Sequence, residues 1–363
     1  MTTNQAYRCE PDFLIAPGET LLETIETMNI TQAELAKRMG RPLKTINGII
    51  KGNTAITPET ALQLERVLGI PYGFWMNLEN NYRETLKKEQ EKLKLQESVK
   101  WLKNFPLKQM IKMGWIEKKD TEVGQIEELL RFFKVASIKA WDDIWQTNVA
   151  FRKSPAFKAN PYAISAWLRK GEIIASELNC SPFNKEKFKS SLEKIRSLTL
   201  ATNPEIFIPE LTKICSNCGV AVVFLPELDG CRASGATKWL NNNTPMILLS
   251  VRHKTNDHLW FTFFHEAGHI LYHGKKMTFV EGLKGIDNQK KEEEANTFSA
   301  DFLIPKREYS QLIETKPSKA EVISFSKRIG IAPGIVVGRL QKDHKIPYSY
   351  YNDLKIRYIW NNK

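Results

Sequence analysis

The sequence predicts a mainly α, multi-domain protein in which one part, towards the C-terminus, is built around a small β-sheet. Three observations support this. The chain has 363 residues, more than one ordinary hydrophobic core organises, so two or three domains are expected. From residue 17 to residue 212 apolar residues recur with helical spacing, interrupted by proline and glycine. After residue 219 short apolar runs rich in β-branched residues replace that spacing, as strands require.

The first part contains two short helices joined by a tight turn. Thr31 is a good N-cap, the apolar residues of the next two turns share one helix face, and Gly40 ends the helix. Pro42 suits the first turn of a second helix, which is expected to run to Gly52 with its isoleucines inward. This is a helix–turn–helix, whose second helix enters the major groove of DNA.

Charge supports DNA binding only locally. The formal net charge is +12, yet residues 1–85 carry 8 basic and 10 acidic side chains. From residue 35 to residue 58 there is no acid, and five lysines and arginines form a cationic patch. A helix–turn–helix used for protein contact is the alternative, and this acid-free stretch argues against it. Gln32 is expected to contact phosphate, and Lys44, Thr45 and Asn47 are expected to reach base edges. Arg41 and Lys51 complete the set of residues expected to bind DNA.

The later part of the chain alternates strands and helices. Strands are predicted at 219–225, 236–240 and 246–251, with an asparagine turn between the last two. A helix is expected from about Asp257 to Tyr272, and a second from near Lys290 to just before Pro305. The stretch 318–342 again has helix–turn–helix rhythm, and we expect it to pack onto this part of the chain. The charged stretch 84–104 is predicted to be a solvent-exposed helix that connects two domains.

The helix expected over 257–272 contains His265, Glu266 and His269 with the spacing HExxH. Residues four apart lie on one helix face, about 6 Å apart along the axis, so the two imidazoles can converge on one ion. Glu266 can reach the open coordination position, take a proton from bound water and pass it to the leaving amine. The motif predicts a zinc hydrolase with one Zn²⁺ ion and Glu266 as its catalytic base. The alternative is a buried helix with two hydrogen-bonded histidines.

A catalytic zinc ion needs a third protein ligand besides the two histidines, and the candidates lie downstream of them in the sequence. Glu292 and Asn296 lie four apart in the second predicted helix, so Glu292 can be the ligand and Asn296 a supporting partner. Glu294 is the alternative ligand, and a solvated acidic first turn is the alternative without metal. His273 lies two turns from His265, about 12 Å along the axis, which is too far to share one ion.

Residues 215–310 resemble the ImmA/IrrE family of zinc metallopeptidases. The resemblance rests on the segments GCRASGATKW at 230–239, ND at 256–257 with WFTFFHEAGH at 260–269, and ExxANxF at 292–298 followed by LIP at 303–305. It implies an α+β zincin-like catalytic domain with a small sheet, metal ligands at His265, His269 and Glu292, and a general base at Glu266. It also implies regulated proteolysis, often of a DNA-binding repressor in phage, mobile-element or stress-response systems. The oxyanion stabiliser stays open among Tyr272, His273 and Arg252.

The first 85 residues resemble the HigA-type antitoxin branch of Cro/repressor-like domains. The residues that carry this are PGE at 17–19, ITPETA at 56–61, FWMNL at 74–78 and Tyr82. Two positions depart from the pattern. Arg41 stands where these proteins usually have an apolar turn residue, and Gly48 inside the second helix costs about 1 kcal/mol of helix stability.

Three domains are therefore predicted: an all-α helix–turn–helix DNA-binding head at 1–85, a helical connector at 86–212, and a zinc metallopeptidase domain with a C-terminal helical segment at 213–363. The predicted function is a DNA-binding transcriptional regulator with a zinc-dependent endopeptidase domain. It would cleave a regulatory protein partner, or itself, in a toxin–antitoxin, mobile-element or stress-response system. The alternative is a non-proteolytic HigA-like antitoxin or repressor whose zinc domain only binds or senses. A third hypothesis is a zinc hydrolase of non-peptide substrates, and the resemblance to the metallopeptidase family argues against it.

The expected partners are operator double-stranded DNA, a protein substrate such as a repressor or toxin, and a second copy of the chain bound through the head. The most apolar runs are too short to cross a bilayer and the first residues lack the apolar core of a signal peptide, so a cytoplasmic protein without membrane contact is expected. The 5 cysteines are an odd number, which suits reduced thiols. Cys215 and Cys218 form a lone CxxC without a second pair, which argues against a zinc knuckle.

Overall fold

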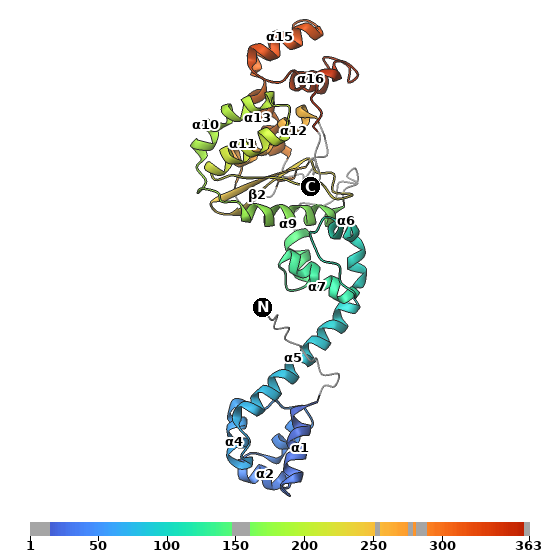
Figure 1. Cartoon of the computed structure of the whole chain (residues 1–363), viewed down its shortest axis with the longest axis vertical. Helices are drawn as coiled ribbons and strands as arrows, with labels where there is room; N and C mark the ends of the chain where they lie inside the picture. The colour runs from blue at the N-terminus through green and yellow to red at the C-terminus, as the bar shows by residue number, and fades with distance from the viewer. Residues whose placement is uncertain (1–14, 147–159, 251–254, 275–278, 281–288, 359–363) are drawn as a thin grey trace, which may run out of the picture. The chain divides into compact units, whose positions relative to one another are not determined.

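The computed structural model describes residues 15–146, 160–250, 255–274, 279–280 and 289–358. The chain divides into two compact units, Met1–Val99 and Lys100–Lys363. Helices dominate both units, and the second also holds a four-stranded sheet (Figure 1), so the mainly α, multi-domain class is confirmed. The predicted boundary near residue 212 falls inside the second unit, and the three-domain division stays a prediction. None of the helices in the described ranges has the length and apolar character needed to span a membrane.

The first unit is a helical head with its own core. Thr31 caps the second helix by accepting a hydrogen bond from the backbone N–H of Glu34 at 3.2 Å, and Gly40 ends it in the left-handed conformation with φ 64°. Pro42 is the N-cap of the third helix rather than part of its first turn, and that helix ends at Ile50, two residues before the predicted end. The helices of the head are α1 (Pro17–Thr27), α2 (Gln32–Met39), α3 (Leu43–Ile50), α4 (Pro58–Leu68) and α5 (Tyr72–Gln96).

The second unit is layered, with its sheet between helices. Figure 1 shows α9 on one side of the sheet and α10, α11, α12 and α13 on the other. The helices are α6 (Leu107–Lys112), α7 (Glu122–Phe133), α8 (Ile138–Trp141), α9 (Pro161–Glu177), α10 (Lys185–Ser197), α11 (Pro204–Asn217), α12 (Asn256–Tyr272), α13 (Gln289–Leu303), α14 (Lys306–Leu312), α15 (Lys319–Ile329) and α16 (Pro333–Lys342).

The sheet has the strand order β1-β3-β2-β4. The pair β1 and β3 is parallel, whereas β2 runs antiparallel to both β3 and β4. Because β2 lies between β3 and β4, its side chains that face α12 are held at a fixed register. The strands are β1 (Ala221–Phe224), β2 (Gly235–Asn241), β3 (Thr244–Leu249) and β4 (Phe279–Val280).

Most predicted elements of this unit appear within two residues of their expected ends. The helices α12 and α13 each begin one residue earlier than predicted, and α13 ends before Pro305 as expected. The short β4 was not predicted. The stretch expected as one connecting helix over 84–104 is the end of α5 followed by a 3-10 helix at Val99–Asn104. The C-terminal helices α15 and α16 pack into the same hydrophobic core as α12, as expected.

Candidate metal centre

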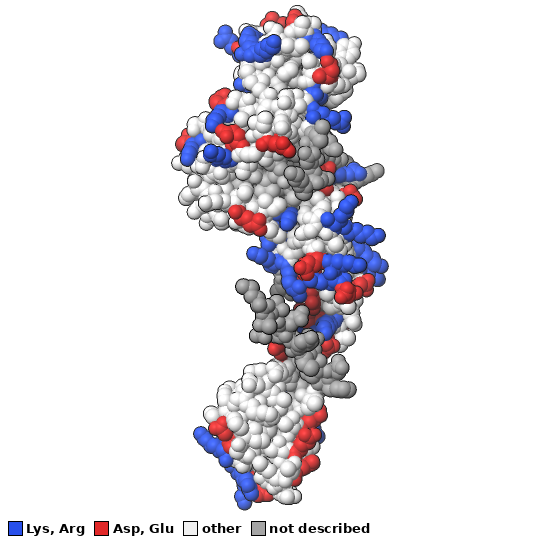
Figure 2. Space-filling view, in the orientation of Figure 1, with Lys and Arg blue, Asp and Glu red and all other residues white. Residues whose placement is uncertain are grey.

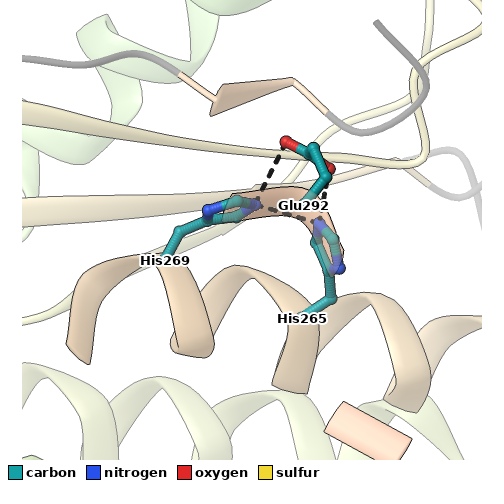
Figure 3. A group of neighbouring side chains, drawn as sticks. All are labelled: His265, His269 and Glu292. Atoms are coloured by element: carbon teal, nitrogen blue, oxygen red, sulfur yellow. Dashed lines mark hydrogen bonds and ion pairs between the residues drawn. The ribbon is translucent and has the colours of Figure 1, made fainter. Parts of the chain in front are cut away.

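Two imidazoles and a carboxylate converge between α12 and α13 (Figure 3). His265 Nε2 and His269 Nε2 lie 3.0 Å apart, and the Glu292 carboxylate lies 3.3 Å from the first and 3.4 Å from the second. Four zinc ligands at about 2.1 Å on a tetrahedron stand roughly 3.4 Å from one another, so these spacings suit a single zinc ion. Both histidines are 1% exposed. The structure thus brings together the three residues expected to hold the metal.

Hydrogen bonds behind the imidazoles fix which nitrogen of each faces the centre. The Asn296 side-chain oxygen lies 3.1 Å from His265 Nδ1, and because that oxygen only accepts, the proton of His265 sits on Nδ1. His269 Nδ1 lies 2.8 Å from His273 Nδ1, and His273 Nε2 lies 3.1 Å from the Glu294 carboxylate. His273 therefore donates to Glu294 and accepts from His269. Both Nε2 atoms are left with lone pairs directed at the centre, as metal ligation requires.

The protonation states of the cluster also suit a cation. Burial lowers the pKa of His269 to about 4, so this imidazole is neutral at pH 7. Burial alone raises the pKa of Glu292, but its close contacts with His265 and His269 outweigh burial and lower the pKa to about 2. A neutral imidazole and an ionised carboxylate are the forms that bind zinc. Glu294, the alternative third ligand, is occupied by His273 and does not enter the cluster.

The expected base, Glu266, is fully buried and has a partner that the sequence analysis missed. Thr237 Oγ1 lies 2.6 Å from Glu266 Oε2 and donates its hydrogen to it. Thr237 is on β2 and is 1% exposed, so this contact crosses from the sheet to α12. Thr237 does lie within the segment 230–239 that supports the peptidase resemblance. That membership was the available signal, although strand alternation alone could not show which residue faces Glu266.

Two glycines make room for the centre. A Cβ at Gly268 would lie 3.0 Å from a ring carbon of Phe298 and 3.3 Å from the Cα of Ala295, both on α13. Glycine at this position therefore lets α13 approach the face of α12 that carries the histidines, which brings Glu292 within reach. A Cβ at Gly235 would lie 2.9 Å from Glu266 Oε1, so glycine at the start of β2 leaves the space that the carboxylate occupies.

Three residues are candidates for oxyanion stabilisation, and the structure describes two of them. Tyr272 is 55% exposed, with its ring against Phe298, while His273 is engaged behind His269. Arg252, the third candidate for oxyanion stabilisation, lies outside the described residues.

Cys215 and Cys218 are buried in the hydrophobic core, where burial raises the pKa of the Cys215 thiol well above its ordinary value. Cys215 therefore packs as an apolar side chain, while Cys218 Sγ lies 3.3 Å from the Ser191 hydroxyl.

The residues expected to bind DNA differ in how far their side chains are exposed to solvent. Lys44 and Lys51 are exposed, whereas Gln32, Thr45 and Asn47 are half-buried. Arg41 is also half-buried and is engaged within the head, where its Nε donates to the Gln63 side chain at 2.7 Å and its Nη2 lies 3.0 Å from the Glu59 carboxylate. Figure 2 shows lysines and arginines gathered along one edge of the head with a few acids beside them, and further acids along the opposite edge.

Comparison with known proteins assigns the two parts. Residues 218–341 match the family described as the IrrE N-terminal-like domain, and residues 22–75 match the helix-turn-helix family. Over 64 residues, which are 18% of this chain and 68% of the relative, the chain is 33% identical to the HTH-type transcriptional regulator YddM of Escherichia coli (strain K12). The chain belongs to the helix–turn–helix regulators and carries an IrrE N-terminal-like domain. Both predicted resemblances are thereby confirmed.

Solved structures similar to the chain match the helix–turn–helix domain. An addiction module antidote protein of a HigA family from Coxiella burnetii is 30% identical, with 23% of this chain and 91% of that chain covered and a TM-score of 0.22. The Pseudomonas aeruginosa antitoxin HigA with higBA promoter is 27% identical, with 23% and 94% covered and a TM-score of 0.22. At such TM-scores these likenesses add nothing to the assignment, which rests on the sequence matches. The IrrE N-terminal-like domain contains the whole His265, His269 and Glu292 cluster.

Proposed function

We propose that the chain is a DNA-binding transcriptional regulator whose IrrE N-terminal-like domain is a zinc-dependent endopeptidase. Its substrate is a regulatory protein partner, or the chain itself, in a toxin–antitoxin, mobile-element or stress-response system. One observation carries the peptidase proposal: His265, His269 and Glu292 present three donor atoms within 4.8 Å of one another, next to the buried carboxylate of Glu266. These three residues would hold one zinc ion, which when bound supplies Lewis-acid chemistry that acidifies water and polarises a carbonyl.

The surrounding residues have distinct tasks in this proposal. Glu266 takes the proton of the attacking water and delivers it to the amine that leaves when the peptide bond breaks. Thr237 holds one oxygen of that carboxylate by a hydrogen bond and so directs the other towards the substrate. Asn296 and the pair His273 and Glu294 keep the lone pairs of the two ligating imidazoles turned to the centre.

The helix–turn–helix domain supplies the second half of the proposal. Its family and its likeness to an HTH-type transcriptional regulator support binding to operator DNA. The exposed amine of Lys51, just after α3, suits a phosphate contact, and Lys44, Thr45 and Asn47 lie on that helix for contacts with bases. We further propose that two copies of the head bind a two-fold operator, because helix–turn–helix domains commonly read paired half-sites.

Metal analysis and co-expression test the peptidase. Wild type and Glu266→Gln are expected to purify with one zinc per chain, and His265→Ala with none. When the chain is co-expressed with the products of neighbouring genes, wild type should yield a cleavage fragment that Glu266→Gln does not. Stoichiometric zinc without such a fragment would favour the non-proteolytic regulator. Absence of metal from the wild-type protein would contradict both zinc-based functions.

A binding assay tests the head. Operator affinity is expected to fall steeply with salt and to be lost in the double variant Lys44→Ala and Asn47→Ala. Exposed Lys94→Ala on α5, which lies outside the helix–turn–helix motif, is the control and should bind as wild type does. Binding that is indifferent to salt and to the double substitution would show that α3 is not the reading helix.

A further inference from the structure

A cavity of about 340 Å³ lies in the IrrE N-terminal-like domain between α12, α13 and α16. This is the size range of sites that bind small molecules or substrate side chains. Much of its wall is apolar, and it comes from elements that are far apart in the sequence. The residues that line it include Ser234, Phe261, Thr262, Ala300, Leu303 and Ile335.

The cavity lies beside the metal centre. Phe261 and Thr262 are one helical turn before His265 and Glu266, on the same face of α12 and about 6 Å away along the axis. The Phe261 ring stacks against the His265 imidazole, with centroids 6.3 Å apart. On α13, Ala300 is two turns beyond Glu292. Ser234 directly precedes Gly235, the first residue of β2, and Gly235 adjoins the Glu266 carboxylate. A peptide bound at the centre can therefore place one of its side chains in the cavity.

The polar groups in and around this wall are largely engaged with one another. The Asp257 carboxylate lies 2.7 Å from Lys355 Nζ, which also donates to the Gln341 side-chain oxygen at 2.8 Å. Arg339 Nε lies 2.6 Å from the Asp343 carboxylate. Because these charges neutralise each other, what the wall offers an occupant is chiefly its apolar surface. A buried apolar wall selects by size and hydrophobicity.

We propose that this cavity is the specificity pocket of the peptidase, and that it binds a large apolar side chain of leucine, methionine or phenylalanine size next to the bond that is cut. The position of the cut bond rests on the proposed peptidase function. Binding of the side chain itself requires neither metal nor turnover, so the two proposals can fail separately.

Filling the cavity is the decisive substitution. Ala300→Phe places a ring in it without removing any contact of the metal centre, and Ala300→Leu is a milder filling variant should the larger one disturb folding. Thr297→Phe adds the same ring to α13 at an exposed position that does not line the cavity, and it is the matched control. Circular dichroism and zinc content should be those of wild type in all variants used.

The first readout is binding of side-chain probes to the full chain, followed by NMR. N-acetyl-phenylalanine amide is expected to bind at least tenfold more tightly than N-acetyl-alanine amide. This preference should disappear in Ala300→Phe, weaken in Ala300→Leu and persist in Thr297→Phe. Equal binding of the two probes by wild type, or a preference that survives Ala300→Phe, would overturn the proposal.

The second readout is cleavage of a peptide library. Wild type should cut next to large apolar residues, the filling variants should shift towards alanine and serine, and N-acetyl-phenylalanine amide should compete with the substrate. Probe binding without any cleavage that depends on Glu266 would support the pocket and contradict the peptidase. Cleavage without side-chain preference would contradict the pocket and leave the peptidase standing. Stimulation of cleavage by the probe would identify an effector site and overturn the proposal.

Discussion

The hydroxyl of Thr237 and the carboxylate of Glu266 are 2.6 Å apart in a site closed to solvent. A hydrogen bond to a charged group is worth about 1.5–3 kcal/mol, and here it also sets the direction of the base. Thr237→Val should therefore slow Glu266-dependent cleavage by roughly 10- to 100-fold while zinc content is unchanged. The rate of fragment formation and the metal content measure this. Thr237→Ser keeps the hydroxyl and should restore most of the rate, whereas a Val variant at wild-type rate would exclude this role.

The protonation of the cluster gives a pH prediction. In the metal-free folded chain the pKa of His269 lies near 4, below its ordinary 6.5, and that of Glu292 near 2, below its ordinary 4.5. The unfolded chain therefore binds more protons than the folded chain as pH falls through these ranges, so stability present at pH 7 is lost in acid. Because protons compete weakly for His269 above pH 5, zinc should be retained on dialysis at pH 7 and 6 and released near pH 4.

The zinc retained after dialysis at each pH measures this prediction, with His265→Ala as the blank. Release that is already complete at pH 6 would contradict the neutral, buried state of His269.

Sequence reasoning was strongest where chemistry depends on local spacing. His265, Glu266 and His269 share one helix, and Glu292 and Asn296 share another, so their relative placement follows from helical geometry. The structure brings all but Glu266 into direct contact as expected, although their roles in binding metal stay predictions. The partner of Glu266 was missed because Thr237 faces it only through the register of β2 against its neighbours. That register is set by long-range pairing, which a single sequence does not display.

Among the elements, the close approach of α12 and α13 depends on Gly268. Val at this position would meet Phe298 and the backbone of Ala295. We expect Gly268→Val to lower the free energy of unfolding by about 1–3 kcal/mol and to weaken zinc affinity, since Glu292 moves away with α13. Gly274→Val is the control, because a Cβ there meets no atom within 4 Å. Chemical denaturation measures the loss of stability, and zinc titration measures the change in affinity. Unaltered zinc affinity in Gly268→Val would show that zinc binding does not depend on the spacing of α12 and α13.

A second close contact lies in the head, where α1 crosses α3. A Cβ at Gly18 would lie 2.1 Å from the carbonyl oxygen of Ile49 and 2.5 Å from the Cα of Ile50. Because both atoms are backbone, Gly18→Ala must displace α3, at a cost of about 3 kcal/mol or more. Operator binding should be lost while zinc content is retained. Gly73→Ala, whose Cβ meets nothing within 4 Å, should leave both unchanged, and operator binding by Gly18→Ala at wild-type affinity would contradict the placement of α3.

The ends of elements show where sequence signals were sufficient. Thr31 and Gly40 fix α2 through a side-chain cap and a left-handed turn, both of which are local. Pro42 fits either the N-cap or the first turn of a helix, and the structure places it at the N-cap. The two-residue strand Phe279–Val280 carries no periodicity that could be recognised. It is defined by pairing with β2.

At the scale of the whole molecule, the cores of the two units contain different residues. One is built from helices of the head, and the other gathers α10 to α16 with the sheet. The candidate metal centre belongs entirely to the second. A ligand stabilises only the unit that binds it, by about 2.7 kcal/mol at a free concentration 100 times its dissociation constant. Zinc is therefore expected to act on one unit and to leave the other unchanged.

Calorimetry of the full chain can show whether zinc stabilises one unit or both. Two unfolding transitions are expected, and removal of zinc by a chelator should lower the temperature of one only. His265→Ala should show that transition at its lowered position with or without chelator, while Gly18→Ala should shift the other transition alone. Since neither substitution touches the core of the other unit, the pair assigns each transition to its unit. If the chelator lowered both transitions equally, the two units would unfold as one cooperative body, and zinc occupancy would then control the stability of the DNA-binding head as well.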